Sequence, residues 1–368
     1  MSDAVIMTKQ KKNLSKPETR APIKQSGIAP SKKLRSLLAI SVALALGLLA
    51  CNHTTTMSTA PVVVRLTHVG NPQTNFGRAA IRFAELTTAK TNGQVRMEVF
   101  PELSLSGGDN LAALKKLQEG EVDATLHSNL IYANLDPRFE VFSLPYVMTS
   151  RQAAYRVVDG DVGNELLCLM KQYNIIGLAY GENGFRQVTN SKRPVARPDD
   201  IQGLRIRVPE TKLYLDTMKA LGADAQVMTF NQVYAALQRG ELDGQENPLS
   251  IIYSSELYKV QKYLTVWDYS WDTVVLGFNR GFWDRLPQYL KDALRLAAQE
   301  TMISMRQWAQ NDDQSLLEQL RKAGMEVTVL TAAQKQPFIE ATKPVYAAEE
   351  AKVGKELVAR VQKIGRGD

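Results

Sequence analysis

The chain contains few of the residues from which catalytic and metal sites are usually built. It has two cysteines and three histidines in 368 residues. The histidines, His53, His68 and His127, are not spaced as metal ligands, and the cysteines complete no such set. The sequence also lacks GxSxG, GxxxxGK[ST] and GxGxxG motifs. It therefore predicts no enzyme activity, no metal and no cofactor.

Residues 51–368 carry no net excess of positive or negative charge. The formal net charge is +7, and residues 1–50 alone hold nine Lys or Arg against two acidic residues. Residues 51–368 therefore contain 36 basic and 36 acidic side chains. A protein that neutralises phosphates needs a basic surface. The sequence thus predicts no nucleic-acid partner, and this neutrality favours a monomer.

The N-terminal apolar run is too short for a permanent membrane span. Leu37–Ala50 comprises fourteen residues after a basic stretch, which is typical of a signal-peptide core. Leu48-Leu49-Ala50-Cys51 resembles a bacterial lipobox, which implies cleavage before Cys51 and lipid on that residue. The alternative is ordinary cleavage near Ala60, with Cys51 discarded. We expect residues 1–50 to be a signal peptide and the polar, Thr-rich residues 51–61 to be a lipidated tether to the membrane.

The second cysteine, Cys168, lies in the apolar segment LLCLM. This context predicts a buried, inert thiol. A disulfide with Cys51 is compatible with an oxidising compartment, but a lipid on Cys51 would exclude it.

Hydrophobic periodicity after the tether alternates between strand and helix. Helix ends are marked by Asn75 as a plausible N-cap, by Asp109 as an N-cap and by Gly120 as a stop. A long helix is expected from Gln288 to about Ala323. This rhythm predicts an α/β fold with a mainly parallel sheet covered by helices. The expected strands are 62–66, 94–100, 122–126, 175–179, 204–208, 225–228 and 273–279.

The segment from Gly184 to Pro248 has the most informative pattern. Arg186 and Arg207 occupy separate strand-like positions, and an Asn-Pro turn follows. A guanidinium group is permanently charged and offers a planar fork that matches a carboxylate. Two of them at strand ends suggest a site for a small organic anion. The alternative is that both arginines are ordinary solvated strand ends.

Three long motifs decide between these alternatives. GFRxxTNSxRPVxxPDDIxGLRIRVP, TFNxVYxALQxGELDGQENP and YKVQKYLT closely resemble the DctP-type substrate-binding proteins of TRAP transporters, and the resemblance covers roughly residues 62–357. It implies a two-lobed periplasmic-binding-protein-like fold with a hinge and a long helix spanning both lobes. It also implies domain I at 61–183 plus 273–312 and domain II at 184–272 plus 313–368.

The resemblance also implies roles for individual residues. Arg207 matches the arginine that grips the ligand carboxylate, Arg186 a second arginine and Asn247 an asparagine on the opposite side. Phe230 matches an apolar wall, and Glu246 with Gln245 is expected to hold the turn. Ser128 and Asn129 occupy a loop that carries specificity in such proteins. Weaker candidates for the same wall are His68, Asn75 and Tyr269.

The predicted function follows from this site. We expect a periplasmic receptor, lipid-anchored to the membrane, that binds a C4-dicarboxylate or a sugar acid such as a uronate or aldonate. The resemblance implies the small and large TRAP membrane subunits as partners. Two alternatives remain compatible with the sequence: a ligand-presenting sensor subunit, and an exported enzyme that acts on organic acids.

Overall fold

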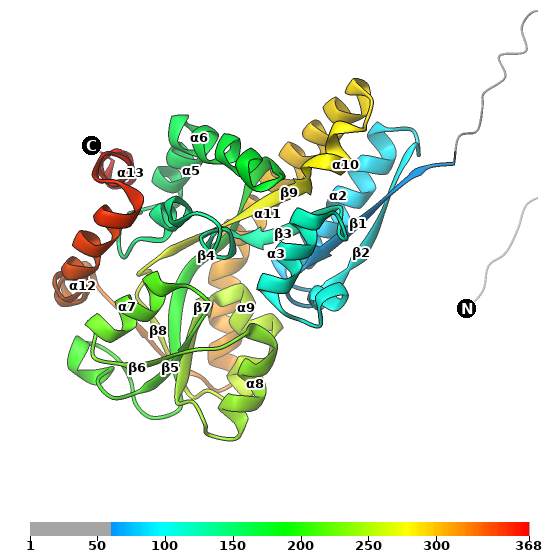
Figure 1. Cartoon of the computed structure of the whole chain (residues 1–368). Helices are drawn as coiled ribbons and strands as arrows, with labels where there is room; N and C mark the ends of the chain where they lie inside the picture. Colours follow the sequence, from blue (N-terminus) through cyan, green and yellow to red (C-terminus); the bar gives the residue numbers. More distant parts are fainter. Residues whose placement is uncertain (1–59, 368) are drawn as a thin grey trace, which may run out of the picture. The chain divides into compact units, whose positions relative to one another are not determined.

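The computed structural model describes residues 60–367 (Figure 1). The expected signal peptide, Cys51 and nearly all of the expected tether lie outside these residues. Among the helices that the structure describes, none has the length and apolar character needed to cross a membrane.

The first half of the sheet forms where the strand–helix rhythm predicts it. β1 (Val62–His68) pairs in parallel with β2 (Val95–Phe100) and β3 (Ala124–Ser128), and β9 (Trp271–Asn279) pairs antiparallel with β3. The intervening helices are α2 (Asn75–Lys90) and α3 (Asn110–Glu119). As expected, Asp109 caps α3 by accepting a hydrogen bond from Ala112, and Gly120 ends it in a left-handed conformation.

A single long strand connects the two halves of the sheet. β4 (Ile175–Asn190) has 16 residues, far more than the segment 175–179 predicted from sequence. It pairs antiparallel with β9 along its first part and with β7 (Gly244–Pro248) and β8 (Tyr263–Val266) along its last part. The register shifts between Glu182 and Gly184, and the φ of Gly184 is +130°, a conformation that glycine adopts more readily than other residues.

The second half of the sheet follows the order β4-β7-β5-β6. β5 (Arg205–Val208) pairs in parallel with both β7 and β6 (Asp224–Val227). Figure 1 shows α8 and α9 together on one side of this half. Its helices are α7 (Lys212–Ala220), α8 (Phe230–Gln238) and α9 (Leu249–Ser254), and β10 (Glu326–Val329) pairs with β8.

The helix α11 (Gln288–Lys322) has 35 residues and reaches both halves. Its N-terminal part buries Leu290 and Leu294 in the core beneath β1 and α2. Its C-terminal part buries Leu320 among residues of α8 and α9. The expected long helix is therefore present, and it packs against both halves of the sheet.

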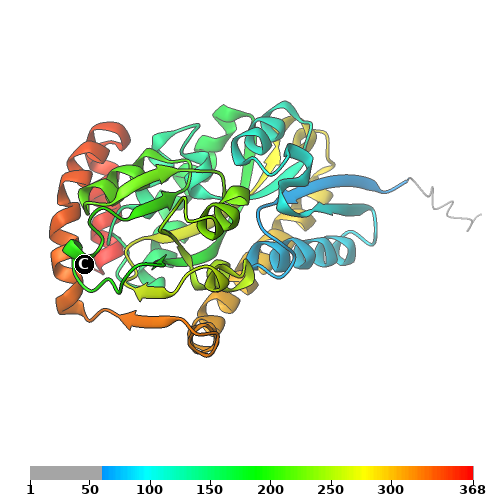
Figure 2. The same cartoon turned by 90° about the horizontal axis from the view of Figure 1, so that it is seen from below.

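The C-terminal segment adds a helix that was not expected. α12 (Ala332–Val353) contains Pro337 and Pro344, residues that normally interrupt helices. It packs against α7, whereas α13 (Lys355–Arg366) packs against α5 (Arg151–Asp159). Figure 2 shows the two terminal helices side by side, with β10 leading from α11 into them. The remaining elements are α4 (Asn129–Tyr132), α6 (Asp161–Leu169), α10 (Arg280–Asp284) and short 3₁₀ helices at 101–106, 137–143, 170–173, 198–200 and 257–259.

Three local predictions were wrong. The N-cap of α2 is Thr74, not Asn75, because the Thr74 hydroxyl accepts the hydrogen bond from Gly77. Asn247 and Pro248 end the buried strand β7 rather than forming a turn, since a residue before proline favours extended backbone. Cys168 is exposed, because α6 turns Leu166 and Leu169 toward the core and leaves position 168 facing solvent.

Candidate functional site

An internal cavity lies where β4, β5, β7 and β9 meet. This inner cavity has a volume of about 60 Å³, which is room for roughly four to six water molecules. Five of the candidates proposed from sequence line it: Arg186, Arg207, Phe230, Asn247 and Ser128. The other lining residues are Val69, Gly70, Phe76, Asn110, Leu130, Ile131, Asn183, Pro209, Ile251 and Asp272.

Arg207 is a buried cation with little compensation from the protein. Arg207 is 2% exposed, and its Nε donates to the carbonyl of Met228 at 2.8 Å. Among the described residues, its nearest carboxylate is Glu210, 3.7 Å from Nη2, which is too far for a hydrogen bond. Burial lowers the pKa of Arg207 to about 10, and the negative charge of Glu210 offsets only part of that effect. Arg207 therefore provides two Nη groups that can bind an anion.

Arg186 differs from Arg207 because its charge is already matched. Its guanidinium donates to both oxygens of Glu246 and, at 2.6 Å, to Asp272. Burial alone would lower the pKa of Arg186, but the two carboxylates raise it well above its ordinary value. Arg186 is thus a structural cation in the cavity wall, and Glu246 holds it there. Glu246 was expected to hold a turn with Gln245, but it lies in strand β7 and pairs with Arg186 instead.

Asn247 and Phe230 extend the wall around the two arginines. The Asn247 amide donates to Gln245 at 2.5 Å and its oxygen accepts from Arg186 at 3.2 Å. These bonds leave one amide hydrogen of Asn247 for a ligand. The Phe230 ring at the start of α8 lies 5.8 Å from the Arg207 guanidinium carbon, within the range of a cation–π contact.

The remaining candidates are either hydrogen-bonded within the protein or absent from the wall of the inner cavity. Ser128 lines the cavity but donates its hydroxyl to Asp272. Asn129 donates to Phe139 and Ser143 and accepts from Thr273, so its side chain is used within the protein. His68, Asn75 and Tyr269 are buried and do not line the inner cavity, and the Tyr269 hydroxyl donates to Glu246 at 2.8 Å.

Sequence reasoning missed three polar residues of the wall, Asn110, Asn183 and Asp272. The Asn183 amide donates to Asp272 at 2.8 Å, and both side chains face the cavity-lining Arg186 network. Asn183 stands three residues before Arg186 in GENGFR, at the register shift of β4. Only the pairing of β4 with β9 brings Asp272 beside it.

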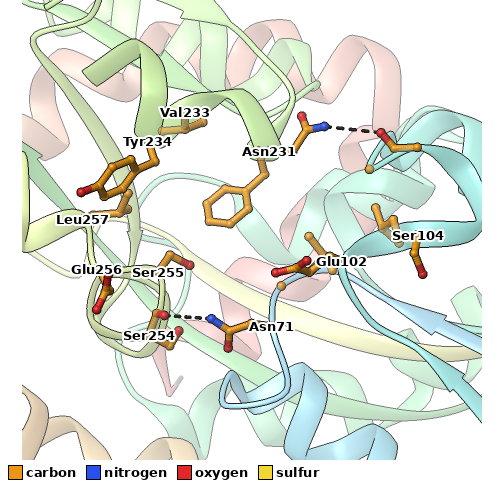
Figure 3. Close-up of a pocket in the computed structure, with 16 residues that line it drawn as sticks. Asn71, Glu102, Ser104, Asn231, Val233, Tyr234, Ser254, Ser255, Glu256 and Leu257 are labelled. Carbon is orange, nitrogen blue, oxygen red and sulfur yellow. Dashed lines mark hydrogen bonds between the residues drawn. The ribbon is translucent and has the colours of Figure 1, made fainter. Parts of the chain in front are cut away.

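A second, larger cavity of about 620 Å³ adjoins the first, and the two share Val69, Gly70 and Phe230. Two asparagines reach across this outer cavity (Figure 3). Asn71 donates to the carbonyl of Ser254 at 2.9 Å, and Asn231 is 3.5 Å from that of Gly107. These bonds join loops of the first half of the sheet to α8 and α9 of the second half.

Comparison with known proteins identifies the family. The model of the family described as "Bacterial extracellular solute-binding protein, family 7", DctP, matches residues 66–352. The chain belongs to this family. Its members are described as solute-binding proteins, and the resemblance stated from the motifs is thereby confirmed.

Individual relatives are similar over most of the chain. The C4-dicarboxylate-binding periplasmic protein DctP of Rhodobacter capsulatus is 34% identical over 82% of this chain and 90% of its own length. The sugar acid binding protein DctPAm of Advenella mimigardefordensis, solved with galactonate, has a TM-score of 0.80 and 31% identity, covering 83% of this chain and 98% of that one.

A third relative comes from Ralstonia eutropha. This TRAP periplasmic solute-binding protein, solved with bound (S)-2-acetolactate, has a TM-score of 0.81 and 28% identity, covering 83% of this chain and 99% of that one. These structural relatives confirm the predicted two-lobed α/β fold. The inner cavity lies between the two lobes, formed by the halves of the sheet on either side of β4.

Proposed function

We propose that this protein is the extracytoplasmic receptor of a TRAP transporter and that it binds a small organic acid in the inner cavity. The observation that carries the proposal is the buried guanidinium of Arg207, which lacks a carboxylate within hydrogen-bonding distance among the described residues. Burying a charge whose nearest carboxylate is too far away for a hydrogen bond is costly. A ligand carboxylate would remove that cost, and relatives of this chain bind C4-dicarboxylates and sugar acids.

The expected affinity is compatible with this site. A hydrogen bond to a charged group contributes roughly 1.5–3 kcal/mol, and a two-pronged arginine–carboxylate pair also fixes the orientation of the acid. Micromolar binding corresponds to about 8 kcal/mol. The Arg207 fork, the free hydrogen of Asn247 and the exclusion of water by Phe230 together supply interactions of this size.

The lobes are proposed to close around the bound acid. We place domain I at 61–183 plus 273–312 and domain II at 184–272 plus 313–368, so that the chain crosses between them within β4, at the start of β9 and within α11. The register shift at Gly184 supports the first of these crossings. The closed form would deliver its ligand unaltered to the small and large membrane subunits. Export to the periplasm and lipid attachment at Cys51 complete the proposal.

A thermal-shift panel of dicarboxylates, aldonates and uronates tests the proposed function. Ligands that stabilise the parent protein should give no stabilisation with Arg207→Ala. Arg207→Lys should recover little, because an ammonium group lacks the planar fork. Undiminished binding by Arg207→Ala would refute the site assignment. Conversion of any bound acid into a product would instead favour an enzyme.

A further inference from the structure

The wall of the inner cavity also contains an acceptor that has no donor among the described residues. Asn183 is 5% exposed, and its Nδ2 donates to Asp272. That bond fixes which end of the amide is the nitrogen. Its Oδ1 is buried and has no hydrogen-bond partner among the described residues. A buried acceptor without a donor costs about 1–3 kcal/mol, so this oxygen calls for a hydroxyl or amine on the ligand.

The surroundings of Asn183 disfavour a second carboxylate. Asp272 lies beside it, with one oxygen accepting from Ser128 and the other from Arg186 and Asn183. The Ser128 hydroxyl is thus already donated. Arg186 is the second of the two cations that line the inner cavity, and its charge is balanced by Glu246 and Asp272. A second ligand carboxylate would therefore meet a negative charge and an acceptor, without an uncompensated cation.

Most of the remaining wall is apolar, apart from the amides of Asn110 and Asn247. Phe76, Leu130, Ile131 and Ile251 line the cavity together with Val69 and Pro209. A polyhydroxylated chain placed against these side chains would leave its hydroxyls without partners.

We propose that the preferred ligand is a short 2-hydroxy monocarboxylate with an aliphatic body. Its carboxylate binds Arg207, its hydroxyl donates to Oδ1 of Asn183, and its body packs against Phe76 and Ile251. The inference rests on the proposed function, because it requires Arg207 to hold the carboxylate. It narrows that function by selecting one class of acid over dicarboxylates and sugar acids.

Calorimetric titration of the purified protein with four acids tests the inference. The probes are 2-hydroxy-3-methylbutanoate, its analogue 3-methylbutanoate without the hydroxyl, succinate and galactonate. The hydroxy acid should bind at least about tenfold more tightly than 3-methylbutanoate and succinate, since neither has a hydroxyl to pair with Asn183. Galactonate has a 2-hydroxyl, but its other hydroxyls would lack partners against the apolar wall, so it too should bind at least about tenfold more weakly. Arg207→Ala should abolish binding of the hydroxy acid.

Two variants then test whether the hydroxyl of the ligand binds Asn183. Asn183→Leu should reduce the preference for the hydroxy acid over 3-methylbutanoate to within about threefold, because the orphan acceptor is gone. Asn110→Leu is the matched control. Its amide also lines the cavity but donates to Glu210, so this variant should retain the tenfold preference even if its overall affinity falls. Thermal unfolding without ligand verifies that both variants fold. If one variant does not fold, the titrations of the parent protein with the four acids still test the inference.

The outcomes separate the two proposals. If succinate or galactonate binds as tightly as the hydroxy acid and still requires Arg207, the inference is wrong and the receptor function stands. An unchanged hydroxyl preference in Asn183→Leu would also refute it. If neither these four acids nor a wider panel of organic acids binds, the proposed function itself fails.

Discussion

The side chains of Arg186 and Glu246 form a buried two-pronged ion pair, with Nε and Nη2 lying 2.5 and 2.9 Å from the two carboxylate oxygens. Arg186 is 3% exposed and Glu246 is fully buried. Arg207, in the same cavity wall, has no such partner among the described residues. Two arginines that look equivalent in the sequence therefore differ: one supports the wall, and the other is the one we propose to bind the ligand.

Replacing Arg186 should destabilise the empty protein severely. Arg186→Met leaves Glu246 and Asp272 buried without their cation, and breaking such a pair costs roughly 3–5 kcal/mol. The free energy of unfolding from chemical denaturation measures this loss. Arg96→Met is a suitable control, because Arg96 pairs with Glu98 on the surface and exposed pairs contribute little. An equal loss in both variants would contradict the assigned role of Arg186.

Replacing Arg207 should have the opposite effect on the empty protein. Arg207→Met removes an insufficiently compensated buried charge and keeps a flexible apolar side chain in its place. The free energy of unfolding without ligand should stay equal or rise, while ligand-induced stabilisation disappears. A large destabilisation of the empty protein would mean that Arg207 is part of the structural network after all.

Removing the Asn71 contact should speed ligand release. Asn71→Ala deletes the hydrogen bond to Ser254 across the outer cavity, a contribution of about 0.5–1.5 kcal/mol to the closed form. The dissociation rate in stopped-flow displacement should rise by about two- to tenfold. Gln73→Ala is the control, since Gln73 is an exposed residue of the same loop. A dissociation rate that does not change in Asn71→Ala would exclude this contact from closure.

The Glu349 carboxyl should make stability depend on pH. Burial and the adjacent Glu140 carboxyl together raise its pKa from 4.5 to about 7, against the opposing effect of Lys352. The folded protein therefore keeps this proton while the unfolded chain loses it, so the group lowers stability as pH rises from about 4.5 to about 7. Glu349→Gln should remove this loss. Its advantage in unfolding free energy over the parent should grow between about pH 5 and about pH 8, and a constant advantage would refute the assignment.

Much of the fold could be predicted because local signals agreed with tertiary packing. The apolar stripe of α11 and the caps of α3 were sufficient to predict both helices. The helix α12 was missed because Pro337 and Pro344 lie inside it, and local chemistry would end a helix at either one. The prediction that Cys168 is buried was wrong for a related reason. An apolar neighbourhood in sequence does not determine which side of a helix faces the core.

The candidate site could be predicted only as far as the motifs extend. Arg207, Asn247 and Phe230 were named from the motifs, and all three line the inner cavity. Asp272 and Asn183 were not, because their importance depends on pairing between β4 and β9, segments almost ninety residues apart. The distinction between Arg186 and Arg207 was equally invisible in the sequence. It depends on which carboxylates the folded chain brings to each one.

Within the sixteen-residue strand β4, Asn183 lies at the register shift and Arg186 lies beyond Gly184, on the part that pairs with β7. In the proposed closure one backbone supplies contacts from both lobes, so a rotation of either lobe would change the spacing of those two side chains. Occupancy of the cavity and the angle between the lobes would then be mechanically linked through a few peptide units. A rigidifying Gly184→Ala replacement would consequently act on recognition and on motion at once, at a position that need not touch the solute.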